Sequence, residues 1–539
     1  MAPKQQRLEK RSQLKIINFF TLLAIILYAS PSVAQDYTGW PAIDRLGLYN
    51  TAEEGQLNKD IWQGHTQSQA VLSVNSLPNT LQHDAYRSLA KKLLLSSAPF
   101  TKEEVNSPAL LTARLEKLIS YGMIDETKEL FDKVKDIDGA DNDFGLESIN
   151  LSLNLLDNNL APICLDIQAS ESKYRDITSW RELSSFCKLR FGNGDKINFN
   201  ELKFVKYPNL AILLRNQPVR IDANLSNIET LIANADNQIS VNSYNHAIRT
   251  PQSISDLTTY LALDKKYKTQ ETYQCYAIEA AKRGIIDTER LATLYKEANF
   301  SADLLTNNGG TVELHPCDVP AYFYQRLELA GNDTDKKSIS TALLKSTMAM
   351  PIQSLMPMAS HLETLDENNS SFELAWRWAS IQSLSGGDLP QNDLYLPLYY
   401  INKGERIPEK SFLEWLKLDR NTEFLKTNKI DPASLLYISQ TLSNEKLNFQ
   451  NNAQKLEYGN IFMLTYAGKS ASLGLGFNDY MQKLYDKGNN AMVIINLLTL
   501  LGNTSINDIH VNEVSVILST LSAYKLEKKA ITLAFEYLQ

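Results

Sequence analysis

The sequence predicts an all-α protein, and we expect its helices to form an α-solenoid of stacked helical hairpins. Apolar side chains recur at helical spacing along most of the chain, whereas alternating strand patterns are scarce. Three turns, centred on Gly122, Asn158 and Gly192, lie 36 and 34 residues apart. This is the period of the tetratricopeptide repeat, a helix–turn–helix unit of ~34 residues. The Trp, Gly and Tyr positions of that repeat are not kept, so the predicted units are degenerate.

The first 34 residues have the features of a secretory signal peptide. Five basic residues precede the apolar stretch Ile16–Ala29, and Ser32-Val33-Ala34 supplies small side chains for cleavage. The stretch has 14 residues, fewer than the ~20 that a membrane-spanning helix needs. We therefore expect cleavage after Ala34 and a periplasmic or secreted mature protein. Retention of the stretch as a membrane anchor is the alternative. We expect no later membrane span.

The rest of the chain divides by pattern into four helical segments. We expect an N-terminal helical cap in 35–100, TPR-like hairpins in 101–215, a helical segment with long loops in 216–330, and a C-terminal helical array in 331–539. The stretch 216–256 is rich in Asn, Ser and Pro, which indicates a break between two arrays. The stretch 299–320 is expected to form a second long loop.

The predicted hairpins follow the turns in order. The first covers 109–134, the second 146–168 and the third 179–205. In the first helix of the first hairpin, Leu111, Leu115, Leu118 and Ile119 form an apolar stripe at i, i+4, i+7 and i+8, and the helix that follows is expected to be amphipathic. Further helices are expected at 275–284, 287–298, 371–388, 513–526 and 527–538.

The charge of the chain argues against nucleic acid as a partner. The net charge is −8; the first 34 residues carry +4, so the remaining 505 carry −12. An acidic surface repels phosphate backbones and anionic lipids. We therefore expect no nucleic acid among the partners of this chain.

Four cysteines form an even set in a chain with an export signal, which favours disulfide bonds. Cys164 lies on the second helix of one predicted hairpin, and Cys187 lies on the first helix of the next. These helices are neighbours in an antiparallel stack, and both cysteines are similarly distant from the turn between them. We predict a Cys164–Cys187 disulfide, worth roughly 3 kcal/mol in the chain-entropy model. Cys275 and Cys317 remain as the second pair, and four buried free thiols are the alternative.

Searches for metal and nucleotide motifs give no site. None of the six histidines pairs with another at helical spacing. His315 lies beside Cys317 and Asp318, a trio with metal-ligand chemistry, but a structural role is the more common one for a loop histidine. Ala467–Ser470 resembles the end of a phosphate-binding loop, yet Met463 occupies the position of its first glycine. We expect no metal and no cofactor.

Two further features are candidates for binding or catalysis. Glu147-Ser148 is the dipeptide that carries the catalytic glutamate of lytic transglycosylases, but the segment that follows it in those enzymes is absent. An exposed helix charge is therefore the favoured interpretation of Glu147. Trp376 and Trp378 lie two apart on a predicted helix and face different directions. Tryptophan more often packs in a core or between helices than in a groove. We expect at least one of the two to be partly exposed, and that one is the groove candidate.

Residues 46–78, 87–100, 110–122 and 179–187, continuing into 277–295, resemble an uncharacterised family of exported alphaproteobacterial helical proteins. The similar positions are packing positions, and the family carries no assigned activity. The resemblance therefore implies export and a helical array, and it supplies no site residue.

These observations predict an exported, non-enzymatic helical scaffold that binds a protein or peptide partner in the cell envelope. Stacked hairpins create long concave surfaces, which suit extended polypeptide partners. One alternative is an envelope enzyme that acts on peptidoglycan or polysaccharide with a pair of carboxylates. Another is a structural subunit of an envelope or secretion assembly. A deep cleft with two carboxylates would favour the enzyme, and a shallow groove would favour the scaffold.

Overall fold

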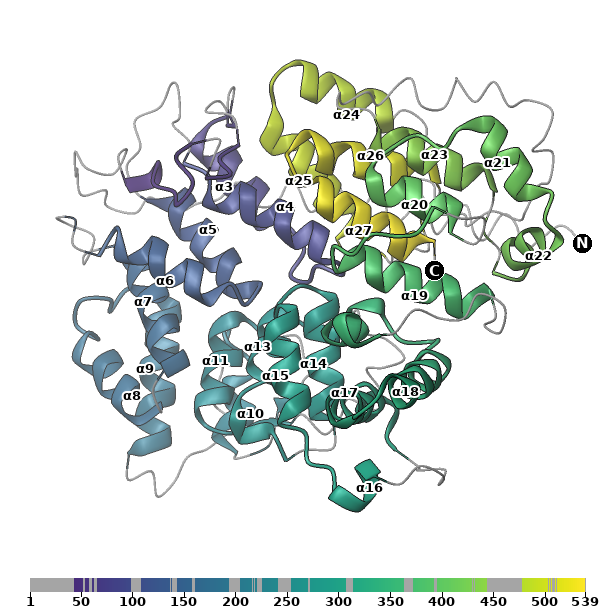
Figure 1. The fold of residues 1–539 in the computed structure, drawn as a ribbon. Helices are drawn as coiled ribbons and strands as arrows, with labels where there is room; N and C mark the ends of the chain where they lie inside the picture. Colours follow the sequence, from purple (N-terminus) through teal and green to yellow (C-terminus); the bar gives the residue numbers. More distant parts are fainter. Residues whose placement is uncertain are drawn as a thin grey trace, which may run out of the picture.

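The computed structural model describes residues 43–538 except for gaps, the longest of which are 98–107, 193–203, 241–253, 363–371 and 444–476. The described residues are mostly helical (Figure 1), which confirms the all-α prediction. In this part of the chain the only paired strands are two-residue β1 (Val219–Arg220) and β2 (Ile239–Ser240), which run parallel. The predicted signal peptide, its cleavage position and the Ala467–Ser470 stretch lie outside the described residues.

The N-terminal helices contain the first two predicted hairpins and the first helix of the third. They are α3 (Gln67–Asn75), α4 (Asp84–Leu95), α5 (Ala109–Ser120), α6 (Ile124–Asp132), α7 (Phe144–Asp157), α8 (Leu160–Ala169) and α9 (Thr178–Phe191). Helices α5 and α6 pack as a hairpin, as do α7 and α8, and α9 packs on α8. Gly122 turns the chain between α5 and α6 with a φ of 64°, a conformation that favours glycine.

The central helices follow in the lower part of Figure 1. They are α10 (Leu210–Leu214), α11 (Asn227–Ala235), α13 (Asp256–Leu261), η3 (Lys265–Tyr267), α14 (Tyr273–Lys282), α15 (Thr288–Lys296), α16 (Ala302–Thr306), η4 (Pro316–Asp318), α17 (Val319–Leu329), α18 (Asp333–Ser346) and η5 (Ile352–His361).

The sequence indicated a break between two arrays in the stretch 216–256. This stretch contains α11, which packs against α5, α7 and α13 and so joins the helices on either side. Ser226 begins α11 with a capping box, in which its hydroxyl accepts the Glu229 N–H and the Glu229 carboxylate accepts the Ser226 N–H. Some of the polar residues in this stretch therefore cap a helix and do not belong to a loop.

The C-terminal helices lie at the upper right of Figure 1. They are α19 (Phe372–Leu384), α20 (Leu396–Lys403), α21 (Glu409–Leu416), α22 (Asp419–Thr427), α23 (Pro432–Leu442), α24 (Phe477–Asp486), α25 (Asn490–Leu501), α26 (Val511–Ala523) and α27 (Glu527–Tyr537). The hairpin predicted at the end of the sequence is α26 with α27, which pack on each other.

The end of the chain returns to its beginning, so the helices do not form one open stack. Helices α25 and α27 both pack on α4, and α25 also packs on α3 (Figure 1). Helix α27 further contacts α19, α20 and α23. Across this junction His83 contacts the Glu536 carboxylate at 2.5 Å, and Asp84 forms an ion pair with Lys529. An open solenoid with one continuous concave face is therefore not what these contacts describe.

A buried ionic network lies next to this junction. The Arg283 guanidinium on the end of α14 is fully buried and donates to Asp256 at 3.1 Å and to Glu279 at 2.7 Å. Arg87 of α4 contacts Asp256 at 3.5 Å. Buried charges of this kind are tolerated only when they are paired, so the network ties α4, α13 and α14 in one arrangement.

The cysteines pair as the sequence predicted. Cys164 of α8 is bonded to Cys187 of α9, with Cα atoms 5.1 Å apart. Cys275 of α14 is bonded to Cys317 of η4, with Cα atoms 5.0 Å apart. Two disulfides are compatible with an oxidising compartment. None of the helices in the described ranges is long and apolar enough to cross a membrane.

Candidate functional site

The strongest candidate site is a cleft of about 340 Å³ on the side of the molecule formed by the N-terminal and central helices. We call it the charged cleft. Its floor and rim are contributed by Ile124, Asp125, Lys128, Leu156, Asp157, Asn234, Tyr260, Leu261, Leu263, Asp264, Lys265, Ile286 and Arg290. The lining is mixed: it contains aliphatic side chains together with three carboxylates and three cations.

Helix ends position the polar side chains of the charged cleft. Asp125 lies in the first turn of α6, directly after the Gly122 turn. Asp157 is the last residue of α7, and Asp264 begins η3 by accepting the Lys266 N–H. Arg290 lies in the first turn of α15, where its N–H is held by the Asp287 carboxylate at 2.7 Å. Polar side chains are favoured at helix ends because they satisfy the free backbone groups there. The ends of α6, α7, η3 and α15 meet at this cleft, and so their charged residues lie close together.

The electrostatics of the charged cleft leave both signs available at its rim. Lys128 forms an ion pair with Asp157 at 2.7 Å, whereas Asp125 and Arg290 are exposed. Burial is the main cause that raises the pKa of the Tyr260 phenol; the carboxylates of Asp125 and Asp157 raise it too, whereas Lys128 and Arg290 oppose the shift. The phenol therefore stays protonated at neutral pH and can donate a hydrogen bond into the charged cleft.

The charged cleft has the chemistry of a binding site. A side chain of a ligand can rest on the aliphatic floor while its polar groups meet Tyr260 and the charged rim, the anatomy of an interface core with a polar rim. No histidine, cysteine or hydroxyl nucleophile with an adjacent base lies among the lining residues. The arrangement suits recognition of a mixed-charge segment.

The tryptophans predicted to line a groove do not do so. Trp376 and Trp378 are both buried, with 3% and 5% of their surfaces exposed. They face different sides of α19, as their spacing requires, but that helix is covered on both sides. Trp376 packs against Phe424 of α22, and Trp378 packs against Tyr395 next to α20. The expectation failed because a sequence does not show how many neighbours a helix has.

Glu147, interpreted from the sequence as an exposed helix charge, lines a second cleft. This cleft of about 260 Å³ lies between α7 and α8 and also contains Asp166, Asn150, Asn154 and Ser170. Its inner wall includes Trp180, whose indole N–H donates to the Ile167 carbonyl at 3.2 Å. Two carboxylates therefore face one small polar space on neighbouring helices.

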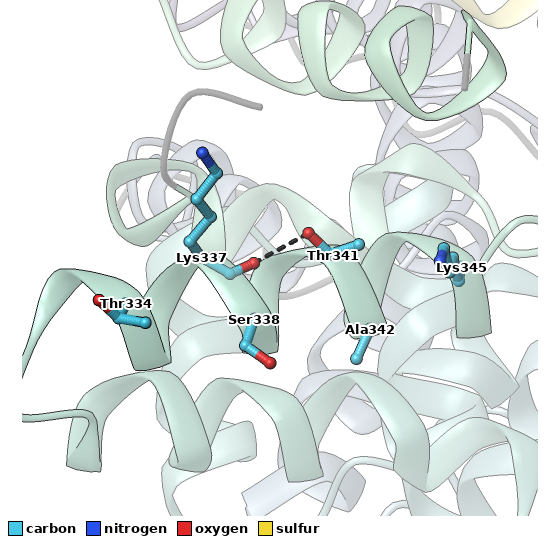
Figure 2. A pocket seen from close by; sticks show the side chains of 6 residues that line it. All are labelled: Thr334, Lys337, Ser338, Thr341, Ala342 and Lys345. Carbon is cyan, nitrogen blue, oxygen red and sulfur yellow. Dashed lines mark hydrogen bonds between the residues drawn. The ribbon is translucent and has the colours of Figure 1, made fainter. Parts of the chain in front are cut away.

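A third hollow, on α18, is a weaker candidate. Thr334, Lys337, Ser338, Thr341, Ala342 and Lys345 line it along one exposed helix face (Figure 2). The Thr341 hydroxyl donates to the Lys337 carbonyl of its own helix at 2.9 Å. All six residues come from one helix, so the described residues form no second wall around a ligand there.

The cluster around His315 differs in composition from the trio that the sequence suggested. The described ligand-type side chains that gather there are Cys275, His315 and Cys317. The two sulfur atoms are joined as a disulfide, so they are not available as thiolates in this state. The expectation that the chain holds no metal stays a prediction.

Comparison of the chain with protein-family models, with curated proteins and with solved structures finds no match. The resemblance to the exported alphaproteobacterial family therefore stays a prediction. The function has to be argued from the clefts themselves.

Proposed function

We propose that the protein is an exported helical scaffold that binds a protein or peptide partner through the charged cleft. The observation that carries the proposal is the combination of an aliphatic floor, a protonated Tyr260 phenol and a rim with both signs of charge. Tyrosine on an apolar floor is typical of the residues that dominate binding energy at protein interfaces. A mixed-charge rim adds specificity and orientation more than affinity.

The way in which the charged cleft is built supports binding without a large rearrangement. Its lining comes from residues between Ile124 and Arg290, on helices that pack on one another. Tyr260 is held against the Gly122 turn, where a Cβ atom at position 122 would lie 2.9 Å from the Tyr260 Cβ. A preformed site loses less conformational entropy on binding than a mobile one.

Export to the cell envelope is part of the proposal. Its support is the order of basic, apolar and small residues before Gln35, together with two cysteine pairs at disulfide distance. The partner is accordingly a protein or peptide of the envelope.

The test reverses charge at the rim. Arg290→Glu and Asp125→Lys should each reduce recovery of the partner by about tenfold or more, because a like charge placed opposite a partner's charge costs ~1.4 kcal/mol or more. Partner recovery is measured by chemical cross-linking in intact cells, affinity capture of the full chain and quantitative mass spectrometry. Lys345→Glu, on the exposed face of α18, is the matched control. Equal recovery with all three variants would contradict the proposal.

A second candidate function is an envelope hydrolase or lyase, and the observation that favours it is the shared cleft of Glu147 and Asp166. Paired carboxylates are the machinery of glycoside cleavage, one acting as acid and the other as base or nucleophile. Incubation of the purified protein with peptidoglycan tests this candidate. Release of soluble fragments by the native protein and not by Glu147→Gln would favour the enzyme over the scaffold.

A further inference from the structure

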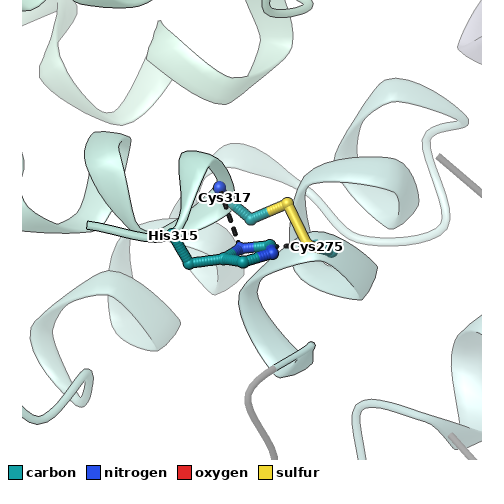
Figure 3. A group of neighbouring side chains, drawn as sticks. All are labelled: Cys275, His315 and Cys317. Carbon is teal, nitrogen blue, oxygen red and sulfur yellow. Dashed lines mark hydrogen bonds between the residues drawn. A yellow bond between two sulfur atoms is a disulfide. The ribbon is translucent and has the colours of Figure 1, made fainter. Parts of the chain in front are cut away.

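The Cys275–Cys317 disulfide has a histidine against it, and this sets it apart from the other disulfide. His315 Nδ1 lies 3.8 Å from Cys275 Sγ and accepts the backbone N–H of Cys317 at 3.3 Å (Figure 3). The nitrogen and both sulfur atoms lie within 4.8 Å of one another. Around Cys164 and Cys187 the described residues form no such ligand group.

Two elements, α14 and η4, hold these groups. Cys275 lies in the first turn of α14, His315 precedes η4, and Cys317 lies within η4, which runs directly into α17. Helix η4 packs on α14 and on α17, and α17 in turn packs on α15 and η5, which both pack on α14. Opening the S–S bond therefore leaves the three side chains beside one another, because helix packing and not the bond alone sets their positions.

We propose that Cys275, His315 and Cys317 form a redox-gated site for Zn²⁺, closed as a disulfide and open when reduced. A dithiol reductant supplies two electrons and two protons, so the S–S bond breaks, two thiols form and the dithiol becomes a disulfide. Zn²⁺ then binds both sulfur atoms as thiolates and the imidazole Nδ1, which gives up the hydrogen bond that it accepts from the Cys317 N–H, and two protons leave to solvent. A water molecule completes the tetrahedron.

The spacing of the groups fits this coordination. Zinc–sulfur bonds of ~2.3 Å and zinc–nitrogen bonds of ~2.0 Å at tetrahedral angles place nitrogen and sulfur about 3.6 Å apart and the two sulfurs about 3.8 Å apart. The observed separation between His315 Nδ1 and Cys275 Sγ is 3.8 Å. The separation between His315 Nδ1 and Cys275 Sγ is therefore already close to the required one.

Soft thiolate ligands with one imidazole favour zinc over calcium or magnesium, which prefer oxygen ligands. His315 is half-buried, so solvent can reach the fourth position, whereas Cys275 is 1% exposed and Cys317 8% exposed. The bound metal would keep α14 tied to η4 when the disulfide is open. Since α14 carries Glu279 and leads to Arg283, this tie also supports the buried ionic network.

The experiment titrates the full chain with Co²⁺ as a spectroscopic substitute for Zn²⁺. The protein carries Cys164→Ser and Cys187→Ser, so that the only thiols come from the proposed site. It is reduced with dithiothreitol, which is then removed under anaerobic conditions. We expect the absorption of tetrahedral Co²⁺ with thiolate charge transfer after reduction, lost on adding Zn²⁺, and no such absorption in the oxidised protein.

The histidine is tested in the same background. His315→Ala should weaken Co²⁺ binding by at least the ~10–100-fold that loss of a group supporting a metal ligand costs. His361→Ala, which removes a histidine that pairs with Glu328 on the surface, should leave binding unchanged.

The proposal can still be tested if one of these variants fails to fold. Far-ultraviolet circular dichroism checks each one, and if the double serine background is unfolded, the reduced native chain is compared with Cys275→Ser/Cys317→Ser. Loss of the thiolate–cobalt absorption in that variant supports the proposal. Absence of the absorption in the reduced native chain, or its retention at equal affinity with His315→Ala, overturns it.

Discussion

The Glu182 side chain binds the backbone of the loop at 205–207 and holds it against α9. Substituting Glu182 therefore tests this part of the structure. The side chain projects from α9, and its carboxylate accepts three successive backbone N–H groups. These belong to Val205 at 2.8 Å, Lys206 at 3.0 Å and Tyr207 at 3.0 Å. Only 8% of the Glu182 surface is exposed. The perturbation is Glu182→Ala, with Glu182→Gln as the conservative variant.

The expected cost follows from what each N–H loses. The Tyr207 bond is buried, so its N–H is left without an acceptor at ~1–3 kcal/mol. The Val205 and Lys206 bonds are only partly buried, and water can replace their acceptor. These two cost nearer the ~0.5–1.5 kcal/mol net value of a hydrogen bond. We expect Glu182→Ala to lower the free energy of unfolding by about 3 kcal/mol, and Glu182→Gln, which keeps one acceptor oxygen, by about 1 kcal/mol.

Two assays report this loss. Urea denaturation followed by circular dichroism measures the global effect, and trypsin cleavage after Lys206 measures release of the loop. Glu423→Ala, at an exposed position of α22, is the matched control and should stay within ~0.5 kcal/mol of the native chain. An unchanged urea midpoint together with an unchanged cleavage rate in Glu182→Ala would refute the reasoning.

Three further predictions concern the cysteines, the buried network and the N-terminus. Replacing Cys164 and Cys187 by serine should lower the free energy of unfolding by about 3 kcal/mol in the chain-entropy model. Urea denaturation without reductant measures this loss. Alkylation of Cys164 in protein taken directly from cells would contradict the pairing. Burial raises the pKa of Asp256 to about 6 in the folded chain. The contribution of this group to stability is therefore complete below its unfolded pKa and is lost as the pH rises through the folded pKa of about 6. The native chain should therefore lose up to about 3 kcal/mol relative to Asp256→Asn between about pH 4 and pH 7, and a difference independent of pH would disprove this. N-terminal sequencing of the protein from the envelope fraction should find a chain that begins at Gln35, and a chain that begins at Met1 would contradict cleavage.

Local sequence patterns predicted the elements that depend on neighbours close in the chain. Helical periodicity and the Gly122 turn located the α5–α6 hairpin, because a helix end with a left-handed turn needs a glycine. The Cys164–Cys187 pair followed from the same reasoning, because the two residues are equally far from one turn. Both features are set within about 25 residues of sequence, so a local pattern contains them.

Features that depend on distant neighbours were not predicted. The burial of Trp376 depends on α22, and the closure of the molecule depends on the Glu536 contact with His83. The charged cleft combines Asp125 with Arg290, and no spacing rule connects residues from different helices. Glu182 shows the same limit, since a glutamate in a helix is interpreted as exposed until the backbone that it binds is known.

The central claim is that the charged cleft is where the partner binds, and site-specific photo-cross-linking tests it most directly. In one variant, a benzophenone amino acid replaces Lys265 at the exposed rim of the charged cleft. In the control variant, it replaces Lys345, which is exposed on α18. After irradiation of intact cells, our account predicts one discrete cross-linked protein from position 265. Its yield should fall when Arg290→Glu is added, and position 345 should give none. Equal cross-linking from both positions, or a product at position 265 that is insensitive to Arg290→Glu, would contradict the account.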